Sequence, residues 1–465
     1  MQTIRFGTDG WRAIIADDYT VANVLRVTDA TARWLKNKGA SQVVIGHDCR
    51  FGGELFLQNA AAMFASYGIK SIVAKGFVST PMVSLGVVKT KSDLGIVITA
   101  SHNPPSYNGY KLKSSFGGPS VPADIAGVEE LIPDHEVRPS TTFEEAIAQG
   151  LISYIDLEKM YIAHVEANFE LDTIRSSGLQ MAYDAMYGAG QNVIRHLFPD
   201  ALLLHCEHNP SFMGQAPEPI HRNLGELSNA IKSSGKFAFG LANDGDADRI
   251  GMYDDEGNFV DSHHLLLLLL LYLHKYKGMT GEVIVTFSVT DKMKKMAELF
   301  GLPFTTKKIG FKYIAEFMLD HDVLVGGEES GGLAVKGHIP ERDGIWIGLT
   351  IMEFMAKTGK SIRELIREVY DLVGAFSTDR YDLHITEEQK QSVIKACKEN
   401  LYSAFGKYQV SRVEDLDGYK YYLDDERWVM IRPSGTEPVL RVYSQAPTHE
   451  EAIEILEQTK KTILA

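Results

Sequence analysis

Short apolar runs alternate with stretches of helical periodicity along the first part of the chain. Residues 21–38 show helical spacing of apolar positions and end at Gly39, residues 42–45 form an apolar run, and residues 54–67 are again helical. The next apolar run covers residues 94–98. Because strands that are joined through helices pair in parallel, this order predicts a mostly parallel sheet with helices on both faces.

The same order returns twice further along the chain. A strand near Leu179 leads through a glycine-containing turn to a helix at residues 191–197, and residues 237–242 give a later strand. A third set has strands at residues 283–286 and 323–325. The three sets show no strong repeat at the level of residues, but in each set an apolar strand is followed by a polar loop. We therefore expect three similar α/β domains that face one cleft. They cover residues 1–150, 151–256 and 257–373.

The pattern changes after about Gly374. A long helical stretch at residues 387–405 is followed by a hairpin-like segment at residues 419–432, a strand at residues 439–443 and a closing helix. Strands and helices no longer alternate strictly, which is typical of an α+β domain. We expect this smaller domain to cover residues 374–465.

Size and charge narrow the classes of function. At 465 residues the chain is too long for one hydrophobic core and suits three or four domains. The net charge is −14 and no long basic cluster is present, which argues against nucleic acid as a partner. Any phosphate must therefore be bound locally.

Three further observations bear on the compartment. The apolar run at residues 265–273 is shorter than the roughly 20 residues that span a bilayer, so we expect a core helix and no membrane partner. Three scattered cysteines, Cys49, Cys206 and Cys397, argue against a disulfide framework or a zinc site. The segment MQTIRFGTDGW lacks the features of a secretion signal or transit peptide. We expect a cytoplasmic protein.

Ser101 follows the apolar run at residues 94–98, in the sequence TASHNPPSYNGYK. Ligand sites of open α/β sheets lie beyond the carboxyl ends of the strands, so a hydroxyl at this point is a candidate functional group. Ser, Asn and Pro are also what an ordinary turn would contain. The serine-hydrolase motif does not fit, because Thr99 and Asn103 occupy the positions where that motif needs glycine.

Asp244, Asp246 and Asp248 alternate in the loop NDGDADR, which follows an apolar strand. In an extended backbone the three carboxylates project to the same side, and this crowding is unfavourable without a cation. Hard oxygen ligands suit Mg²⁺ or Ca²⁺, and Mg²⁺ commonly shares its shell with phosphate oxygens. An EF-hand calcium loop is disfavoured, since Arg249 and Asp255 stand where it needs Gly and Glu. The remaining alternative is a solvated acidic turn.

Two further loops carry groups that suit a phosphorylated sugar. The segment RPSGTEPVLR begins at Arg432 and ends at Arg441, and the planar fork of arginine matches phosphate oxygens. The segment GGEESGG places Glu328 and Ser330 two residues apart, so that a carboxylate and a hydroxyl can bond neighbouring sugar hydroxyls. Taken alone, the first is equally typical of a hairpin turn and the second of a solvent-facing connection.

Four ordered motifs together resemble the α-D-phosphohexomutase family, particularly its bacterial phosphoglucomutase and phosphomannomutase branch. The motifs are TASHNPP with NGYK, DGDADR, GEESGG and RPSGTEP. The resemblance extends over nearly all of the chain, from FGTDGWR to the C-terminal domain. It implies a heart-shaped enzyme around a central cleft, with three domains of one fold and a fourth that closes over the substrate.

The resemblance also implies roles for individual residues. Ser101 matches the phosphoserine of the family. Lys111 and Arg12 match catalytic positions near proton transfer and charge stabilisation, and His102 is a further candidate acid or base whose place beside a turn favours a positional role. The implied Mg²⁺ site comprises Ser101, Asp244, Asp246 and Asp248. The implied substrate-binding residues are Arg50, Lys308, Glu328, Ser330, Arg432, Ser434, Gly435, Thr436 and Arg441.

The implied reaction interconverts hexose 1-phosphate and hexose 6-phosphate, with glucose and also mannose as the sugar, through a hexose 1,6-bisphosphate. Phosphoglucosamine mutase is the alternative within the family, and a non-catalytic phosphosugar-binding protein is the alternative outside it. The expected partner is a phosphosugar, and the expected state is a monomer or weak homo-oligomer.

The chain departs from the family pattern in two places. Gly332 replaces a histidine that some members with dual sugar specificity carry, and His338 is the candidate substitute. The segment GHDCR stands where the family usually has a sequence like GRDTR. Arg50 is nevertheless retained at the position that the resemblance assigns to phosphate orientation.

Overall fold

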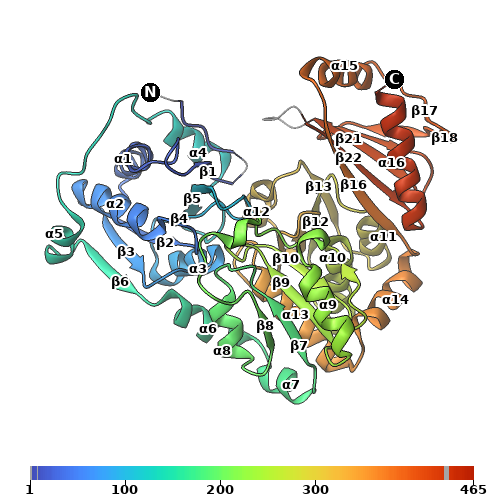
Figure 1. The fold of residues 1–465 in the computed structure, drawn as a ribbon, viewed down its shortest axis with the longest axis horizontal. Helices are drawn as coiled ribbons and strands as arrows, with labels where there is room; N and C mark the ends of the chain where they lie inside the picture. The colour runs from blue at the N-terminus through green and yellow to red at the C-terminus, as the bar shows by residue number, and fades with distance from the viewer. Residues whose placement is uncertain (1–2, 8, 434–438, 465) are drawn as a thin grey trace. The chain divides into compact units, whose positions relative to one another are not determined.

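The computed structural model describes residues 3–7, 9–433 and 439–464. Its helices and strands alternate over most of the chain, as the apolar pattern predicts (Figure 1). The residues form two compact units, Met1–Glu282 with Gly310–Glu364, and Val283–Ile309 with Leu365–Ala465. Within the described part of the chain, no helix combines the length and the apolar character that crossing a membrane would require.

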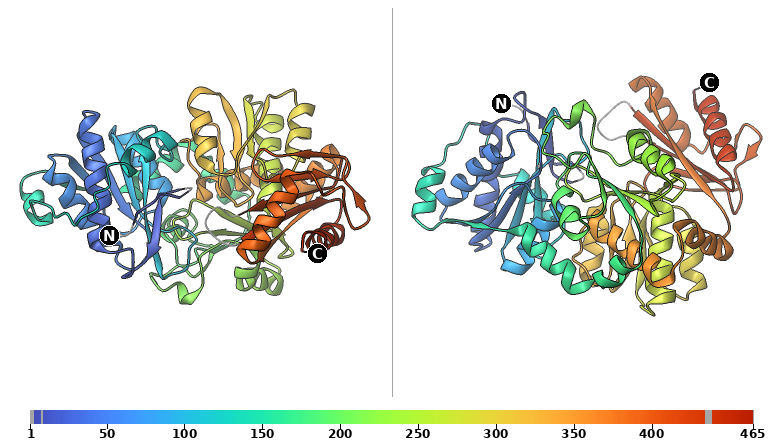
Figure 2. Two further views of the ribbon diagram at one scale, coloured as in Figure 1. Left: turned by 90° about the horizontal axis from the view of Figure 1, so that it is seen from above. Right: turned by 60° about the horizontal axis from the view of Figure 1, so that its bottom comes forward.

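The first sheet has six strands. It and its helices comprise β1 (Trp11–Ile14), α1 (Val21–Asn37), β2 (Gln42–His47), α2 (Gly53–Ser66), β3 (Lys70–Ala74), α3 (Thr80–Thr90), β4 (Leu94–Ile98), β5 (Tyr107–Ser114), α4 (Pro122–Glu129), α5 (Phe143–Ala148) and β6 (Ile152–Ile155). The strand order is β1-β5-β4-β2-β3-β6. Strands β4, β2, β3 and β6 are parallel, whereas β5 pairs antiparallel with β4 and β1. Helices α1 and α2 pack together beside the sheet, and α3 contacts β2 and β4 (Figures 1 and 2).

Burial in this sheet explains the apolar runs of the sequence. All five residues of β4 are buried, as in a parallel strand that is covered on both faces. Strand β5 differs, because Lys111 and Lys113 are both buried within it. Residues two apart in a strand project to the same face, so β5 presents two amino groups on one side of the sheet.

The second sheet has five strands. It and its helices comprise α6 (Leu157–Asn168), α7 (Leu171–Ser176), β7 (Met181–Asp184), α8 (Gln191–Leu197), β8 (Leu202–Leu204), η1 (Phe212–Gly214), η2 (His221–Asn223), α9 (Gly225–Ser234), β9 (Phe239–Asn243), β10 (Ile250–Tyr253) and β11 (Phe259–Val260). The strand order is β11-β10-β9-β7-β8, with β9, β7 and β8 parallel and β10 antiparallel to its neighbours. The fully buried strand β9 ends at Asn243, directly before Asp244.

The following segment supplies elements to both compact units. They are α10 (Ser262–Leu270), η3 (Leu271–Tyr276), β12 (Glu282–Thr286), α11 (Lys292–Leu299), β13 (Phe304–Lys307), α12 (Phe311–Asp320), β14 (Val323–Gly327), β15 (Leu333–Val335), α13 (Gly344–Thr358) and α14 (Ile362–Val373). Strand β12 pairs parallel with β13, and β14 pairs antiparallel with β15. The leucine run lies in α10 and η3 and is fully buried, which confirms the predicted core helix.

The C-terminal region is an α+β domain, as predicted. It comprises β16 (Ser377–His384), α15 (Glu387–Lys398), β17 (Ala404–Phe405), β18 (Tyr408–Gln409), β19 (Arg412–Glu414), β20 (Tyr419–Tyr422), β21 (Trp428–Pro433), β22 (Val439–Ala446) and α16 (His449–Ile463). Its main sheet is antiparallel in the order β16-β22-β21-β20-β19.

The predicted helix at residues 387–405 was wrong in its second part. Helix α15 ends at Lys398, and Asn400 adopts a left-handed conformation with φ of 52°. Asparagine tolerates this conformation better than most residues, and a left-handed residue ends an α-helix. Phe405 then pairs with Tyr408 in a short antiparallel ladder and packs in the core of the domain.

Candidate active site

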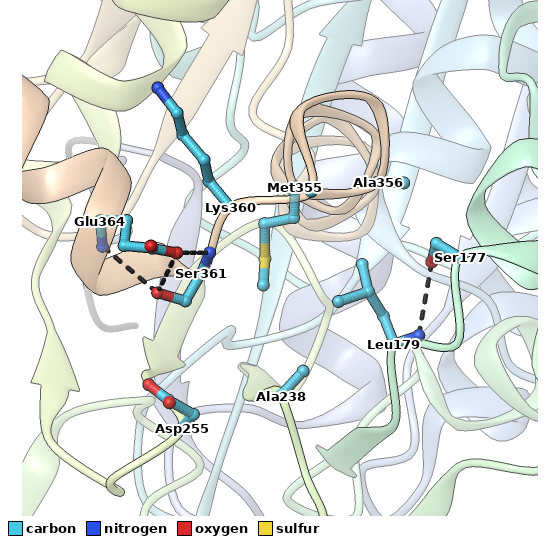
Figure 3. Close-up of a pocket in the computed structure, with 10 residues that line it drawn as sticks. Ser177, Leu179, Ala238, Asp255, Met355, Ala356, Lys360, Ser361 and Glu364 are labelled. Atoms are coloured by element: carbon cyan, nitrogen blue, oxygen red, sulfur yellow. Dashed lines mark hydrogen bonds between the residues drawn. The ribbon is translucent and has the colours of Figure 1, made fainter.

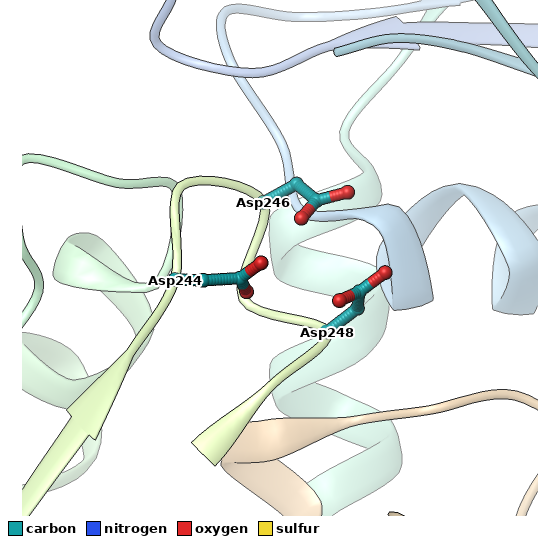
Figure 4. A group of neighbouring side chains, drawn as sticks. All are labelled: Asp244, Asp246 and Asp248. Atoms are coloured by element: carbon teal, nitrogen blue, oxygen red, sulfur yellow. The ribbon is translucent and has the colours of Figure 1, made fainter. Parts of the chain in front are cut away.

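Three aspartates form the acidic centre of the loop that follows β9. One carboxylate oxygen from each of Asp244, Asp246 and Asp248 lies within 4.8 Å of the others, and all three residues are buried (Figure 4). Burial, together with the charges of Asp248 and Asp246, raises the pKa of Asp244 well above its ordinary value. Carboxylates crowded in this way cannot all ionise without a nearby positive charge.

The free oxygen atoms of this loop fit a divalent cation. Asp246 Oδ1 and Asp248 Oδ1 are buried and accept no hydrogen bond, whereas the Oδ2 atoms accept from Lys111 Nζ at 2.8 and 2.9 Å. Ser101 Oγ donates to Asp244 Oδ2 at 2.6 Å. Three carboxylates and a hydroxyl are hard oxygen donors, which is the ligand set that Mg²⁺ prefers.

The loop after β4 brings Ser101 to these carboxylates. Ser101 is 1% exposed, and His102 Nδ1 lies 3.3 Å from Ser101 Oγ. Burial lowers the pKa of His102 well below its ordinary value, and the charges of Arg249 and Arg12 act in the same direction, so the imidazole is neutral. Arg12, which lies in β1, donates to Asn103 Oδ1 at 2.6 Å.

Lys111 belongs to a closed set of ion pairs, which we call the charge ring: Asp9, Lys111, Asp248 and Arg342. Lys111 Nζ lies 2.9 Å from Asp9 Oδ2 and 2.9 Å from Asp248 Oδ2. Arg342 Nη2 lies 2.7 Å from Asp248 Oδ2 and also pairs with Asp9. Burial acts to lower the pKa of Lys111, but the carboxylates outweigh it and raise that pKa above its ordinary value. Lys111 therefore keeps its proton in this arrangement.

Sequence reasoning identified Lys111 but missed Asp9 and Arg342. The available signals were weak: Asp9 stands in FGTDGW and Arg342 in PERDG, and both segments combine charged residues with a nearby glycine, as a turn also does. Asp9 and Arg342 are 333 positions apart, so only the folded chain reveals that they pair.

Lys113 and Glu341 form a second buried pair beside the charge ring. Lys113 Nζ lies 2.7 Å from Glu341 Oε2, both side chains are 0% exposed, and Ser84 Oγ donates to the same oxygen at 3.0 Å. Lys113→Met leaves the Glu341 carboxylate buried without its main counter-charge, so we expect a loss of about 3–5 kcal/mol. A decrease of several degrees in the thermal unfolding midpoint would show it.

The matched control is Lys38→Met, which breaks an ion pair of 2.6 Å with Asp124 at half-exposed positions. It should cost roughly 0.2–1 kcal/mol. The double variant Lys113→Met with Glu341→Leu should recover most of the loss, because no unpaired buried charge remains. Equal midpoints for Lys113→Met and Lys38→Met would contradict the prediction.

The GEESGG loop lies between β14 and β15 and carries Glu328 and Ser330. Glu328 is 5% exposed and its Oε1 accepts the backbone N–H of Gly310 at 2.9 Å. Burial raises the pKa of Glu328 to about 7. The carbonyl of Gly331 accepts the N–H of Ile250 at 3.2 Å, and Ile250 begins β10 directly after the loop that carries the three aspartates. The structure therefore places the GEESGG and DGDADR loops side by side.

His338 is the candidate substitute for the histidine that Gly332 replaces, and its ring contacts Asp343 and Trp346. Its Nε2 lies 2.9 Å from Asp343 Oδ2, and its ring stacks on Trp346 with centroids 3.8 Å apart. Tyr161 donates to the same carboxylate at 2.8 Å. A hydrogen bond and an aromatic stack therefore hold the imidazole, and its role as a substitute stays a prediction.

Arg50 is also predicted to bind substrate. The side chain is 0% exposed, and its two terminal nitrogens donate to carbonyl oxygens of the Ser101 loop at 2.6–3.0 Å. A guanidinium whose terminal N–H groups are used by the backbone has little left to offer a phosphate. In the structure Arg50 contacts the backbone of the Ser101 loop, and its assignment to the substrate stays a prediction.

The remaining substrate-binding candidates belong to the second compact unit. Arg432 on β21 lies opposite Arg441 on β22, and Arg432 Nε lies 3.4 Å from Asp417 Oδ1. Asp417 Oδ2 accepts the N–H of Ile309 at 2.8 Å, which ties the segment after Lys308 to the same carboxylate. Three further candidates lie outside the described residues: Ser434, Gly435 and Thr436.

A surface pocket of about 370 Å³ lies near the starts of β7 and β9, at the end of β9 opposite the aspartate loop (Figure 3). Leu179 and Ala238, which line it, precede β7 and β9, whereas Asp244 follows β9. Met355 and Ser361 contribute from α13 and the turn after it. The pocket is therefore separate from the acidic centre.

Four family models match this chain in order. Residues 3–139, 159–257 and 261–373 match the phosphoglucomutase/phosphomannomutase alpha/beta/alpha domains I, II and III. Residues 386–462 match the C-terminal domain of the same family. The four matches together include most of the chain.

Similar proteins extend over the same length but carry different names. A protein named phosphoglucomutase/phosphomannomutase from Thermococcus kodakarensis is 30% identical over 97% of this chain and 96% of its own. A phosphoglucosamine mutase from Methanococcus aeolicus is 30% identical over 98% of each chain. A crystal structure from Thermus thermophilus, provisionally named a phosphomannomutase, superposes with a TM-score of 0.88 at 32% identity over 100% of both chains.

Proposed function

Because the chain belongs to the phosphoglucomutase/phosphomannomutase family of phosphohexomutases, we propose that it interconverts glucose 1-phosphate and glucose 6-phosphate, and also the mannose phosphates. The observation that carries this proposal is the hydrogen bond of 2.6 Å from Ser101 Oγ to Asp244, at the edge of a buried three-aspartate cluster. The hydroxyl therefore lies beside a set of hard oxygen ligands of the kind that Mg²⁺ shares with phosphate oxygens.

We assign Ser101 as the phosphate carrier. The phosphoryl group leaves Ser101 Oγ for a hydroxyl oxygen of the sugar phosphate, which gives a hexose 1,6-bisphosphate and the free serine. Transfer of the other phosphate back to Ser101 Oγ releases the isomeric monophosphate. Phosphoryl transfer depends chiefly on positioning and on neutralisation of the phosphate oxygens. Arg12, Lys111, Arg249 and Arg342 are cations whose charges act on His102, the neighbour of Ser101.

Ser101, Asp244, Asp246 and Asp248 would hold Mg²⁺. When bound, this ion neutralises negative charge on the transferring phosphate and polarises it. The carboxylates act in its absence too, because they hold Lys111 in place through hydrogen bonds of 2.8 and 2.9 Å.

The proton balance of the transfer involves the groups beside Ser101. The sugar hydroxyl loses a proton and Ser101 Oγ gains one. In net terms this proton passes from the attacking sugar hydroxyl to Ser101 Oγ. Lys111 stays protonated, since the carboxylates around it raise its pKa against the effect of burial, and we assign it to balance the negative charge near this proton transfer. His102 is neutral and its Nδ1 lies 3.3 Å from Ser101 Oγ, and we assign it to orient that oxygen.

We propose that Glu328 and Ser330 bind the sugar hydroxyls, and that Arg432, Arg441 and Lys308 bind the phosphate that does not react. Support comes from chemistry: a buried carboxylate with a pKa of about 7 can accept or donate a hydrogen bond near neutral pH. Two guanidinium groups opposite each other on paired strands suit a phosphate dianion.

A coupled assay tests the function. We expect glucose 1-phosphate and mannose 1-phosphate to be converted to the 6-phosphates when Mg²⁺ and a trace of glucose 1,6-bisphosphate are present, with glucosamine 1-phosphate a poorer substrate. If none of the three sugar phosphates is converted but calorimetry still shows that they bind, the chain is a phosphosugar-binding protein and not a mutase.

Phosphoglucosamine mutase is the second candidate function. It is favoured by the Methanococcus aeolicus relative of that name, which is as similar in sequence as the Thermococcus protein. A kcat/KM for glucosamine 1-phosphate above that for glucose 1-phosphate would select this candidate.

A further inference from the structure

The backbone of Ser101 has a conformation that the surrounding structure must enforce. Its φ is 51°, in the left-handed region that serine rarely adopts. Residues held in this region persist only where neighbouring contacts determine them, and such positions gather at functional sites. Ser101 is also 1% exposed, so its backbone groups need partners within the protein.

The amide of Ser101 is held by a two-step hydrogen-bond chain. Its N–H donates to Thr99 Oγ1 at 2.9 Å, and Thr99 Oγ1 donates in turn to Asp48 Oδ2 at 2.5 Å. Thr99 and Asp48 are both 0% exposed. Because the hydroxyl proton is directed to a carboxylate, the oxygen of Thr99 is free to accept from Ser101.

The carbonyl of Ser101 is held by Arg50. Arg50 Nη2 donates to the carbonyl oxygens of Ser101 and Asn103, both at 2.6 Å. Nη1 donates to those of Pro104 and Tyr107 at 2.8 and 3.0 Å. The two terminal nitrogens therefore bind four carbonyls of a single loop, which a lysine ammonium at the end of a flexible chain cannot reproduce.

Asp48 contacts both Thr99, which holds the amide of Ser101, and Arg50, which holds its carbonyl. Its Oδ1 accepts the backbone N–H of Arg50 at 2.9 Å, and its Oδ2 lies 3.3 Å from Arg50 Nε. Arg50 Cζ lies 5.1 Å from the centroid of the Phe212 ring, in the segment between β8 and β9. One carboxylate thus fixes both groups that hold the Ser101 backbone.

The metal loop closes on the same carbonyl. A Cβ atom at Gly245 would lie 2.6 Å from the carbonyl oxygen of Ser101. The loop that carries Asp244 therefore contacts the Ser101 backbone directly, and any shift of that backbone changes the contact of 2.6 Å between Ser101 Oγ and Asp244.

We propose that Asp48, Thr99 and Arg50 form a loop clamp that positions Ser101 Oγ for phosphoryl transfer, and that Arg50 is a positioning residue that makes no contact with the substrate phosphate. This inference rests on the proposed role of Ser101 as phosphate carrier. The clamp acts on the backbone on each side of the hydroxyl, so it affects the transfer step and leaves sugar-phosphate binding intact.

The test compares Arg50→Lys and Thr99→Val with Thr99→Ser, which keeps the hydroxyl. We expect Arg50→Lys and Thr99→Val to lower kcat, and the rate at which glucose 1,6-bisphosphate phosphorylates Ser101, by about 100-fold, since a misplacement of about 1 Å has that effect. KM for the sugar phosphate should stay within about twofold. Thr99→Ser should keep most of the wild-type activity.

Two kinetic results would overturn the proposal. A large rise in KM of Arg50→Lys with kcat preserved would make Arg50 a substrate ligand, and unchanged kinetics in Thr99→Val would remove the clamp. Hydrogen exchange of the Ser101 amide gives a readout without turnover: it should be slow in the wild type and in Thr99→Ser, and fast in Thr99→Val. Equal exchange in the three proteins would also reject the clamp.

Failure of the proposed function has a different signature. The wild type would then convert none of the sugars and would acquire no phosphate from the bisphosphate. The exchange rates of the Ser101 amide would still report on the clamp in that case.

Discussion

Ser101→Ala is expected to abolish both the phosphoenzyme and turnover. The methyl side chain cannot carry a phosphoryl group, and loss of a covalent nucleophile lowers kcat by up to about 10⁶-fold. We expect activity on glucose 1-phosphate to fall by at least about 10³-fold. Intact-mass measurement after incubation with glucose 1,6-bisphosphate should show one phosphate on the wild type and none on the variant.

A matched control lies in the same loop. Ser106 is exposed, and Ser106→Ala should keep both the phosphate and the activity. Calorimetry should show that Ser101→Ala still binds glucose 6-phosphate, because sugar binding is assigned to other residues. An active Ser101→Ala enzyme, or phosphate retained on that variant, would exclude Ser101 as the carrier.

Asp246→Asn is expected to remove the metal-dependent activity. The amide oxygen can still accept from Thr80, which donates to Asp246 Oδ2 at 2.5 Å, so the change is mainly one of charge. Burial acts to raise the pKa of Asp246, but Lys111 outweighs it and keeps that pKa below its ordinary value, so the wild-type group is an anion. Loss of one charge-stabilising group costs about 10²–10³-fold in kcat, and we expect a decrease of at least that size.

The measurement is a titration of activity with Mg²⁺ after treatment with a chelator. The wild type should lose activity with the chelator and recover it on addition of Mg²⁺, whereas Asp246→Asn should stay inactive at every Mg²⁺ concentration. Asp200→Asn changes an exposed acid of the same domain and should behave as the wild type. Full activity of Asp246→Asn in the presence of the chelator would refute the metal site.

The fold was largely predictable because parallel strands that are covered on both faces leave apolar runs in the sequence. Strand β4 is the clearest example, since its predicted and observed bounds agree. The helix predicted at residues 387–405 was too long, because the spacing of apolar residues does not reveal that one residue, Asn400, adopts a left-handed conformation.

The site was predictable where its residues directly follow strands. Ser101 and Asp244 do so, and the structure brings them into contact. Arg50 also follows a strand, but the sequence cannot tell whether a guanidinium reaches a ligand or the carbonyls of a loop. Asp9 and Arg342 were missed because their pairing depends on contacts between distant parts of the chain.

The charge ring also sets the point during synthesis after which a complete active site can form. Lys111 precedes its partner Asp248 by 137 residues, so at about 5–20 residues per second it leaves the ribosome roughly 7–27 s before that carboxylate. Arg342 follows later still. A nascent or prematurely released chain that ends before Arg342 can contain Ser101 and all three aspartates, yet Asp9 and Asp248 lack one of their cations. Such a fragment therefore cannot complete the charge ring.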